Sequence, residues 1–160
     1  MGFNTGMRRG EILNLVWSRV DLKNNVIRLR SEDTKDDERR TIPICPDLHA
    51  ELKKIQKAKP GIGEGRVFTF KGKQLKDIRT GLRKACKAAG IKYGRFEEGG
   101  FIFHDLRHTF NTNMRKAGVP ESVIMEITGH STREMFDRYN TIDEADCKQA
   151  MDKFAAFVSS

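Results

Sequence analysis

The sequence has few cysteines and no long apolar run, and these two shortages exclude several classes of protein. Its three cysteines, Cys45, Cys86 and Cys147, are odd in number and far apart, with no Cys-x-x-Cys pair. They suggest neither a disulfide framework nor a thiolate zinc site, and they fit a reducing compartment. No segment approaches the roughly 20 apolar residues that cross a bilayer, and MGFNTGMRRGEIL contains no apolar core of a signal peptide. We therefore expect a soluble, cytoplasmic protein without a membrane span.

The length and the net charge of the chain limit the number of domains and the kinds of partner to expect. At 160 residues the chain fits one domain with a substantial core, and it has no internal repeat or low-complexity segment. It carries 30 Lys and Arg against 22 Asp and Glu, a net charge of +8. Such a balance favours a polyanionic partner, although many soluble domains carry a modest positive charge for solubility alone. Charge leaves both interpretations open.

The first half of the chain predicts a helix followed by a hairpin. RGEILNLVW has apolar residues at helical spacing, so we expect a helix that starts near Gly6 or Met7, capped by Asn4 or Thr5, with Arg8 in its first turn. The β-rich runs VIRLR and RRTIPI flank the polar SEDTKDDE and predict a long hairpin with Lys35 on its connection.

The rest of the chain is expected to be mainly helical. Pro46 opens one helix, and RVFTF, residues 66–70, predicts a third short strand. The expected fold class is therefore mixed α/β, mainly α-helical, with a small antiparallel β-sheet. Further helices are predicted over 75–90, over 104–117, from Pro120 to Gly129, from Ser131, and from Thr141 or Ile142 to Val158, the last with an apolar stripe that needs a partner surface.

The stretch FIFHDLRHTF, residues 101–110, places His104, Arg107 and His108 within about one and a half helical turns among apolar side chains. These three residues could have one of three roles: packing in the core, binding a metal, or holding an oxyanion. A His-x-x-x-His spacing can bind zinc, but Asp105 stands where zincins have Glu, and the charge of Arg107 would oppose a divalent cation. Packing is favoured for His108 alone.

Arg8 and Arg9 support the anion clamp. Cations at a helix N-terminus oppose the helix dipole, so a sequence selected only for folding would prefer Asp or Glu there. A guanidinium and a helix N-terminus that point the same way make an anion site. A solvated arginine pair is the alternative.

Five motifs, in this order along the chain, resemble those of the tyrosine recombinases, the phage integrase family. Each is weak alone, but together they cover nearly the whole chain, and Tyr139 of the last motif comes nine positions after His130 of the motif before it, as in the family. The motifs are TGMRRGEI with Arg8 and Glu11, TKDDERRTIPI with Lys35, HDLRHTF with His104 and Arg107, TGH with His130, and RYN with Tyr139.

The resemblance implies an enzyme that cleaves and rejoins DNA through a covalent 3′-phosphotyrosine, without metal, nucleotide or other cofactor. Tyr139 would attack the scissile phosphate, His104 would accept its proton, and Lys35 would protonate the leaving 5′ oxygen. Arg8 and Arg107 would neutralise charge on the phosphoryl oxygens, with a hydrogen bond from His130. Glu11 would orient Arg8, whereas Asp105 and His108 would support these groups or pack.

The resemblance also implies partners and a place of action. We expect double-stranded DNA as the substrate, a homotetramer on DNA joined through the C-terminal helix, and a cytoplasmic location in a bacterium or with a phage. Residues 1–160 are expected to form a single catalytic domain, truncated at its N-terminus and lacking the upstream DNA-clamping domain of the family. The acidic run at 36–38 departs from the family pattern beside Lys35 and weakens that assignment.

Two alternatives remain. A type IB topoisomerase uses similar residues to relax DNA. A non-catalytic helix-turn-helix could be formed by GVPESVIMEITGHSTREMF, with its second helix starting at Ser131, but it would leave Arg8, Lys35 and His104 unexplained.

Overall fold

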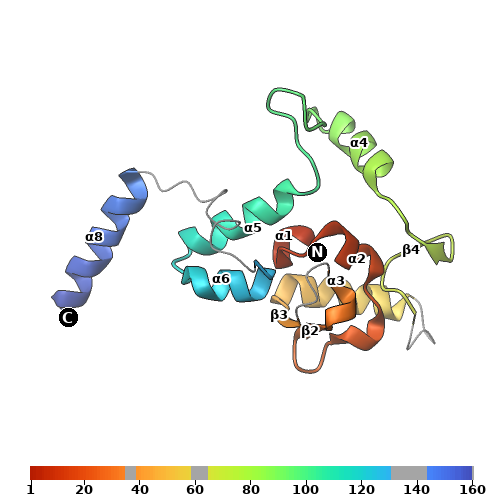
Figure 1. The fold of residues 1–160 in the computed structure, drawn as a ribbon, viewed down its shortest axis with the longest axis horizontal. Coiled ribbons are helices and arrows are strands. Elements are labelled where there is room, and N and C mark those ends of the chain that lie inside the picture. The colour runs from red at the N-terminus through yellow and green to blue at the C-terminus, as the bar shows by residue number, and fades with distance from the viewer. Residues whose placement is uncertain (35–38, 59–64, 131–143, 160) are drawn as a thin grey trace.

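A three-stranded antiparallel sheet forms the centre of the molecule (Figure 1). The structure is a computed structural model, and it describes residues 1–34, 39–58, 65–130 and 144–159. The strands are β1 (Val20–Asp21), β2 (Val26–Leu29) and β3 (Arg40–Pro43), paired in that order. The predicted hairpin of β2 and β3 is confirmed, with Ile27 opposite Ile42. Strand β1 was not predicted, because two residues are too few to show alternation.

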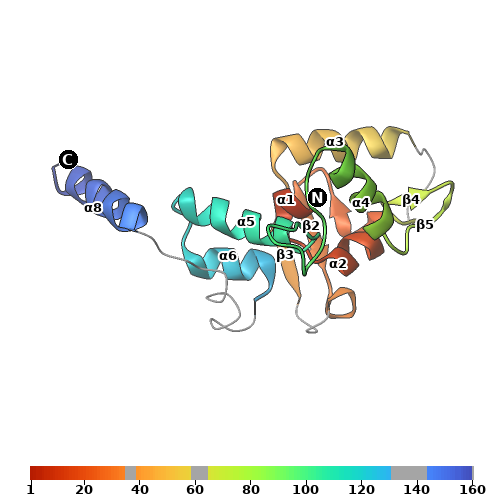
Figure 2. The ribbon, with the colours of Figure 1, turned by 90° about the horizontal axis from the view of Figure 1, so that it is seen from above.

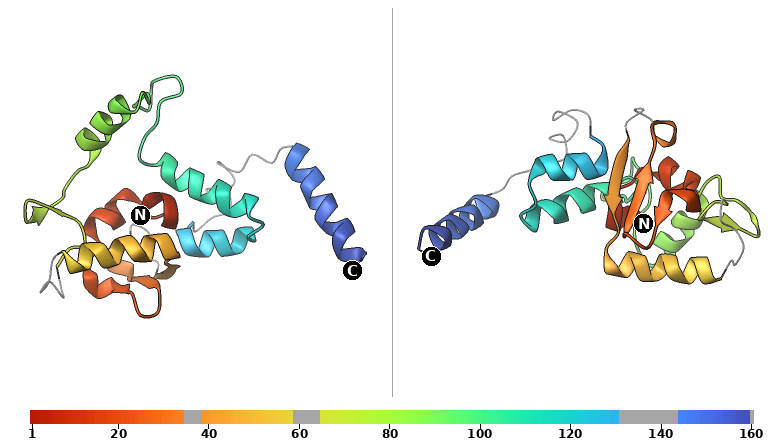
Figure 3. Two further views of the ribbon diagram at one scale, coloured as in Figure 1. Left: turned by 180° about the vertical axis from the view of Figure 1, so that it is seen from behind. Right: turned by 90° about the horizontal axis from the view of Figure 1, so that it is seen from below.

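The core lies between this sheet and the helix α3 (Pro46–Lys57), which runs along the sheet (Figures 2 and 3). Helix α3 begins at Pro46 as predicted, because proline fits the first turn, where its missing N–H has no partner to lose. The core combines side chains of the sheet and of α3 with others from the N-terminal region and from the segment before β4 (Thr69–Phe70). They include Met7, Ile12, Trp17, Ile27, Ile42, Leu48, Leu52 and Val67.

The N-terminal helix differs from the prediction. Two helices are present, α1 (Gly2–Thr5) and α2 (Arg9–Asn14), instead of one that starts near Gly6 or Met7. Gly6 ends α1 in the left-handed conformation, with φ of 62°. Arg8 then lies at the N-cap of α2, where the Glu11 side chain accepts its backbone N–H, so neither Asn4 nor Thr5 caps this helix.

The second half supplies a pair of helices, α5 (Asp105–Lys116) and α6 (Glu121–Thr128), which lie side by side in Figure 1. Helix α1 packs on α5, and α6 contacts β3. Both helices end close to the predicted glycines, and Gly129 takes the left-handed conformation at the C-cap of α6. Through these contacts α6 brings its last turn against the sheet and the N-terminal helices.

Two further elements begin later than predicted. Helix α4 (Arg79–Ala88) starts four residues after Leu75; its N-cap is Ile78, and Asp77 before it accepts the backbone N–H of Arg79 at 2.9 Å. The third strand is reduced to β4 (Thr69–Phe70), which pairs with β5 (Lys73–Gln74) in a separate two-stranded sheet. The remaining elements are two short 3₁₀ helices, η1 (Trp17–Arg19) and η2 (Ser31–Asp33).

The C-terminal helix α8 (Glu144–Val158) stands apart from the sheet in all three views (Figures 1 to 3). The helix predicted from Ser131 and the first residues of the last helix lie outside the described residues. Met151, Phe154 and Val158 of the predicted apolar stripe are 65%, 60% and 66% exposed, so the other described residues do not cover this stripe. Among the described helices, none has the length and apolar character that a membrane span requires. The predicted fold class, mixed α/β and mainly helical with small antiparallel sheets, is confirmed.

Candidate active site

Arg8 is fixed where helix α2 begins. Its guanidinium Nη1 lies 3.4 Å from Oε1 of Glu11, and its Nη2 donates to the carbonyl oxygen of Gly129 at 3.1 Å. The other carboxylate oxygen of Glu11 accepts the backbone N–H of Arg8 at 2.8 Å. One carboxylate therefore orients both the main chain and the side chain of Arg8, and the side chain stays 19% exposed.

Arg107 lies on α5 and is buried, with 2% of the residue exposed. Its Nη1 donates to the carbonyl oxygens of Gly6 at 2.8 Å and of Thr128 at 2.7 Å. These residues lie at the ends of α1 and α6, where helical carbonyls lack an intrahelical partner and carry partial negative charge. The second guanidinium is thus held by two helix C-termini.

His130 follows the C-cap of α6 and is buried. Its Nδ1 lies 2.9 Å from the hydroxyl oxygen of Thr128. Burial, assisted by the positive charges of Arg107 and Arg8, lowers the pKa of His130 to about 3. The imidazole is therefore neutral at neutral pH.

His104 is at the N-cap of α5 and is more exposed than His130. Its ring meets that of His108 edge to face, with 4.7 Å between the centroids. Partial burial, followed by the charges of His108 and Arg107, lowers the pKa of His104, so its imidazole is neutral at neutral pH and can accept a proton.

His104 and Arg107 share a cavity of about 790 Å³ with four further arginines. Two of these lie on α4, one on α2 and one on the loop before α5. This concentration of guanidinium groups suits a polyanion rather than a neutral ligand. The four are Arg9, Arg79, Arg83 and Arg95.

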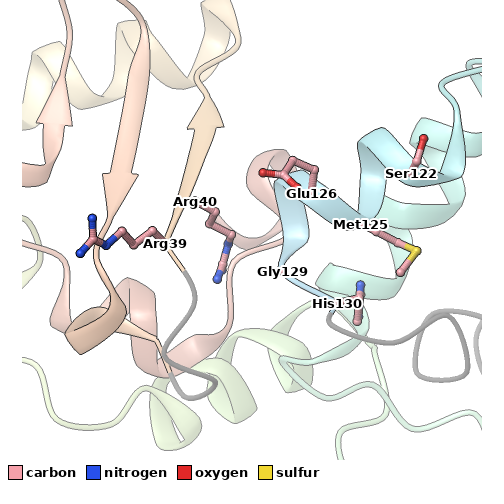
Figure 4. A pocket seen from close by; sticks show the side chains of 7 residues that line it. All are labelled: Arg39, Arg40, Ser122, Met125, Glu126, Gly129 and His130. Carbon is pink, nitrogen blue, oxygen red and sulfur yellow. The ribbon is translucent and has the colours of Figure 1, made fainter.

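Arg40 is a buried partner that the sequence did not suggest as a site residue. Its Nη2 donates to Oε2 of Glu11 at 2.6 Å, and both side chains are almost fully enclosed. Arg40 also lines a second cavity, of about 540 Å³, with Gly129 and His130 (Figure 4). Its strand register was an available signal, because Arg40 shares the core-facing side of β3 with Ile42.

Residues 1–146 match the family model described as the phage integrase family. The chain belongs to this family. The match does not favour either alternative, the topoisomerase or the non-catalytic helix-turn-helix.

Similar proteins are integrases and tyrosine recombinases. The chain is 32% identical to the integrase of Salmonella phage P22 in an alignment 150 positions long, which covers 85% of this chain and 36% of that protein. It is 31% identical over 127 residues to a tyrosine recombinase XerA of Saccharolobus solfataricus, covering 79% of this chain and 38% of that one. The chain thus spans well under half the length of these curated relatives.

Solved structures give the same fold. The catalytic domain of bacteriophage HP1 integrase superposes with a TM-score of 0.63 at 30% identity, over 86% of this chain and 68% of that one. A XerA recombinase superposes with a TM-score of 0.75 at 24% identity, over 96% of this chain and 55% of that one.

Four of the integrase-family motif residues converge at the end of α6. Arg8, Arg107 and His130 meet there, with Glu11 behind Arg8. His104 lines the same cavity as Arg107, so it lies beside this group. Lys35 and Tyr139 lie outside the described residues, and their predicted roles stay predictions.

Asp105, next to His104, has a structural role, and the described residues show no metal site. The Asp105 carboxylate accepts the backbone N–H of Ile102 at 2.7 Å and supports the start of α5. Within the described ranges, no three His, Cys, Asp or Glu side chains gather as they would around a metal ion.

Proposed function

We propose that this chain is the catalytic part of a site-specific DNA recombinase or integrase. The observation that carries the proposal is the convergence of two guanidinium groups and one imidazole, from Arg8, Arg107 and His130, on the last turn of α6. Such a group provides fixed positive charge and hydrogen-bond donors for a phosphodiester whose negative charge grows during transfer. Arginine suits this role because it stays protonated and has a planar donor fork.

In the proposed cleavage step, the phenol oxygen of Tyr139 forms a bond to phosphorus and the bond from phosphorus to the 5′ oxygen breaks. His104 takes the phenol proton, and Lys35 gives a proton to the leaving 5′ oxygen. The product is a 3′-phosphotyrosine and a 5′ hydroxyl. Rejoining is the same step in reverse, with the 5′ hydroxyl of a strand as the nucleophile, so no nucleotide or metal is consumed.

Double-stranded DNA is the proposed substrate. The net charge of +8 and the arginine-lined cavity beside His104 and Arg107 support it. Among the structural neighbours, a Tn1549 transposon integrase is described in complex with circular intermediate DNA. We propose that residues 1–160 act as one catalytic domain, in the cytoplasm of a bacterium or with a phage.

Covalent capture tests the proposal. The protein would be incubated with nicked duplexes of randomised sequence, denatured in detergent, and assayed for protein that carries DNA. We expect an adduct with the wild type and none with Tyr139→Phe, which loses only the hydroxyl. The chain has two tyrosines, so Tyr93→Phe is the matched control and should retain the adduct. An adduct that persists in Tyr139→Phe would remove Tyr139 from the role.

We also propose that α8 docks on a neighbouring protomer in a DNA-bound tetramer. The exposed Met151, Phe154 and Val158 support this, because an apolar face of this kind requires a cover. Deletion of residues 144–160 should preserve the melting temperature and weaken assembly on DNA. If the shortened chain unfolds or aggregates as a monomer, α8 belongs to its own core and the docking idea is wrong.

A further inference from the structure

Arg40 is a buried cation at the first position of β3. Only 2% of its side chain is exposed, and its Nη2 lies 2.6 Å from Oε2 of Glu11, whose side chain is 3% exposed. Burying an ion pair requires both charges to lose their water, and this loss can exceed the attraction between them. The pair is therefore poorly explained as a device for stability alone.

The polar atoms of Arg40 strengthen this point. Its Nε and Nη1 are buried and have no hydrogen-bond partner among the described residues. A buried donor without a partner destabilises the folded state. An apolar side chain of similar length would avoid that loss, so the guanidinium is better explained by what it holds in place.

Arg40 holds the turn that carries His130. A Cβ atom built on Gly129 would lie 2.7 Å from Nη1 of Arg40 and 3.1 Å from Cζ, so the Gly129 backbone packs directly on the guanidinium. Gly129 also has φ of 68°, and its carbonyl oxygen accepts from Arg8. Figure 4 shows the Arg40 side chain reaching toward Gly129, whereas Arg39 points away.

Arg40 therefore touches two separate supports of the proposed site. One is the Glu11 carboxylate, which orients the main chain and guanidinium of Arg8. The other is Gly129, which directly precedes His130. We propose that Arg40 is a positioning residue that sets Arg8 through Glu11 and His130 through Gly129, without touching the phosphate itself. This inference rests on the proposed function.

The test compares Arg40→Met, Arg40→Lys and a control, Arg19→Met. Methionine keeps the length and removes the charge. Lysine can keep an ion pair with Glu11 but lacks the planar group under Gly129. Arg19 also makes a largely buried ion pair, with Asp33 at 2.6 Å, but it is not part of the proposed site.

Two quantities are measured on a duplex recovered by covalent capture: the rate of adduct formation at saturating DNA, and the dissociation constant. A small misplacement of catalytic groups can slow a reaction about a hundredfold. We expect a loss of that order for Arg40→Met, a smaller loss for Arg40→Lys, and a rate like the wild type for Arg19→Met. The dissociation constant should stay within about threefold, because the phosphate contacts remain.

A wild-type rate in folded Arg40→Met overturns the inference. So does a rate that falls only in proportion to the folded fraction of the protein. If the methionine variant does not fold, the same comparison is made with Arg40→Lys, and a wild-type rate in that folded variant overturns the inference. NMR separates this inference from the proposed function, because the His130 imidazole and Arg8 Nε resonances should shift in Arg40→Met and not in Arg19→Met. If the wild type forms no adduct but these shifts appear, the proposed function fails and the positioning role stands.

Discussion

Arg8 and Arg107 donate to consecutive carbonyl oxygens of one turn, Arg8 to Gly129 at 3.1 Å and Arg107 to Thr128 at 2.7 Å. The two arginines are 99 positions apart in the sequence, and the end of α6 holds both guanidinium groups. Two like charges held this way repel each other, and an anion bound between them would relieve the repulsion. If the site acts on DNA as proposed, it is organised for a phosphate before the DNA binds.

Replacing Arg107 should affect both activity and stability. Arg107→Met removes a proposed charge stabiliser, so we expect adduct formation to slow by roughly 10² to 10³-fold. It also leaves two buried carbonyl oxygens without their donor, which should lower the free energy of unfolding by about 2–4 kcal/mol. Lys116→Met on the same helix is the control, because Lys116 is exposed. A wild-type rate in Arg107→Met would contradict the role.

The low pKa of His130 predicts how stability depends on pH. The ordinary value is 6.5 and the folded value is about 3, so between these pH values the unfolded chain binds a proton that the folded protein does not. Stability should therefore decrease as the pH falls from about 6.5 toward 3, by up to about 1.4 kcal/mol per pH unit.

The measurement is urea unfolding at several pH values, and His130→Gln should flatten the dependence. Some slope should remain, because the pKa values of His104 and His108 are also lowered. An unchanged slope in His130→Gln would show that this imidazole is not the group concerned.

Gly6 should not tolerate a side chain. A Cβ there would lie 2.7 Å from Cδ1 of Phe110 and 2.8 Å from Cγ2 of Thr128, at φ of 62°. We expect Gly6→Ala to lower the free energy of unfolding by about 2–4 kcal/mol, from the backbone strain and the overlap together. Gly10→Ala is the control: it lies within α2 with nothing near its Cβ position, and it should stabilise by about 0.5–1 kcal/mol. Equal melting temperatures for the two variants would refute the expectation.

Adduct formation should continue in excess EDTA. The proposed charge stabilisers are the side chains of Arg8, Arg107, Lys35 and His130, none of which needs a divalent ion. The assay compares the adduct yield with and without the chelator. Activity that disappears in EDTA and returns with added divalent cations would revive a metal role for His104 and His108.

The sequence predicted the elements whose pattern is local and repeated. Runs rich in β-forming residues on either side of a polar stretch identified β2 and β3, and glycine marked the end of α6. The start of α2 was missed because it depends on a single φ at Gly6 and on the reach of the Glu11 side chain. Arg8 and Arg107 were found through motifs. Arg40 was not: alternation along β3 could have placed it on the core-facing side with Ile42, but its contact with Glu11 across the fold is not visible in the sequence.

The carbonyls that hold Arg107 belong to the main chain, and every amino acid carries the same carbonyl. Position 128 can therefore change its side chain without losing the bond to Arg107, whereas the hydroxyl beside His130 would be lost. Thr128→Val would thus remove the hydroxyl beside His130 and keep the carbonyl oxygen that binds Arg107. A change at position 128 therefore tests the support of the imidazole alone, whereas a Cβ at Gly6 or Gly129 would meet other atoms at 2.7 Å and would disturb the backbone that presents carbonyl oxygens to the arginines.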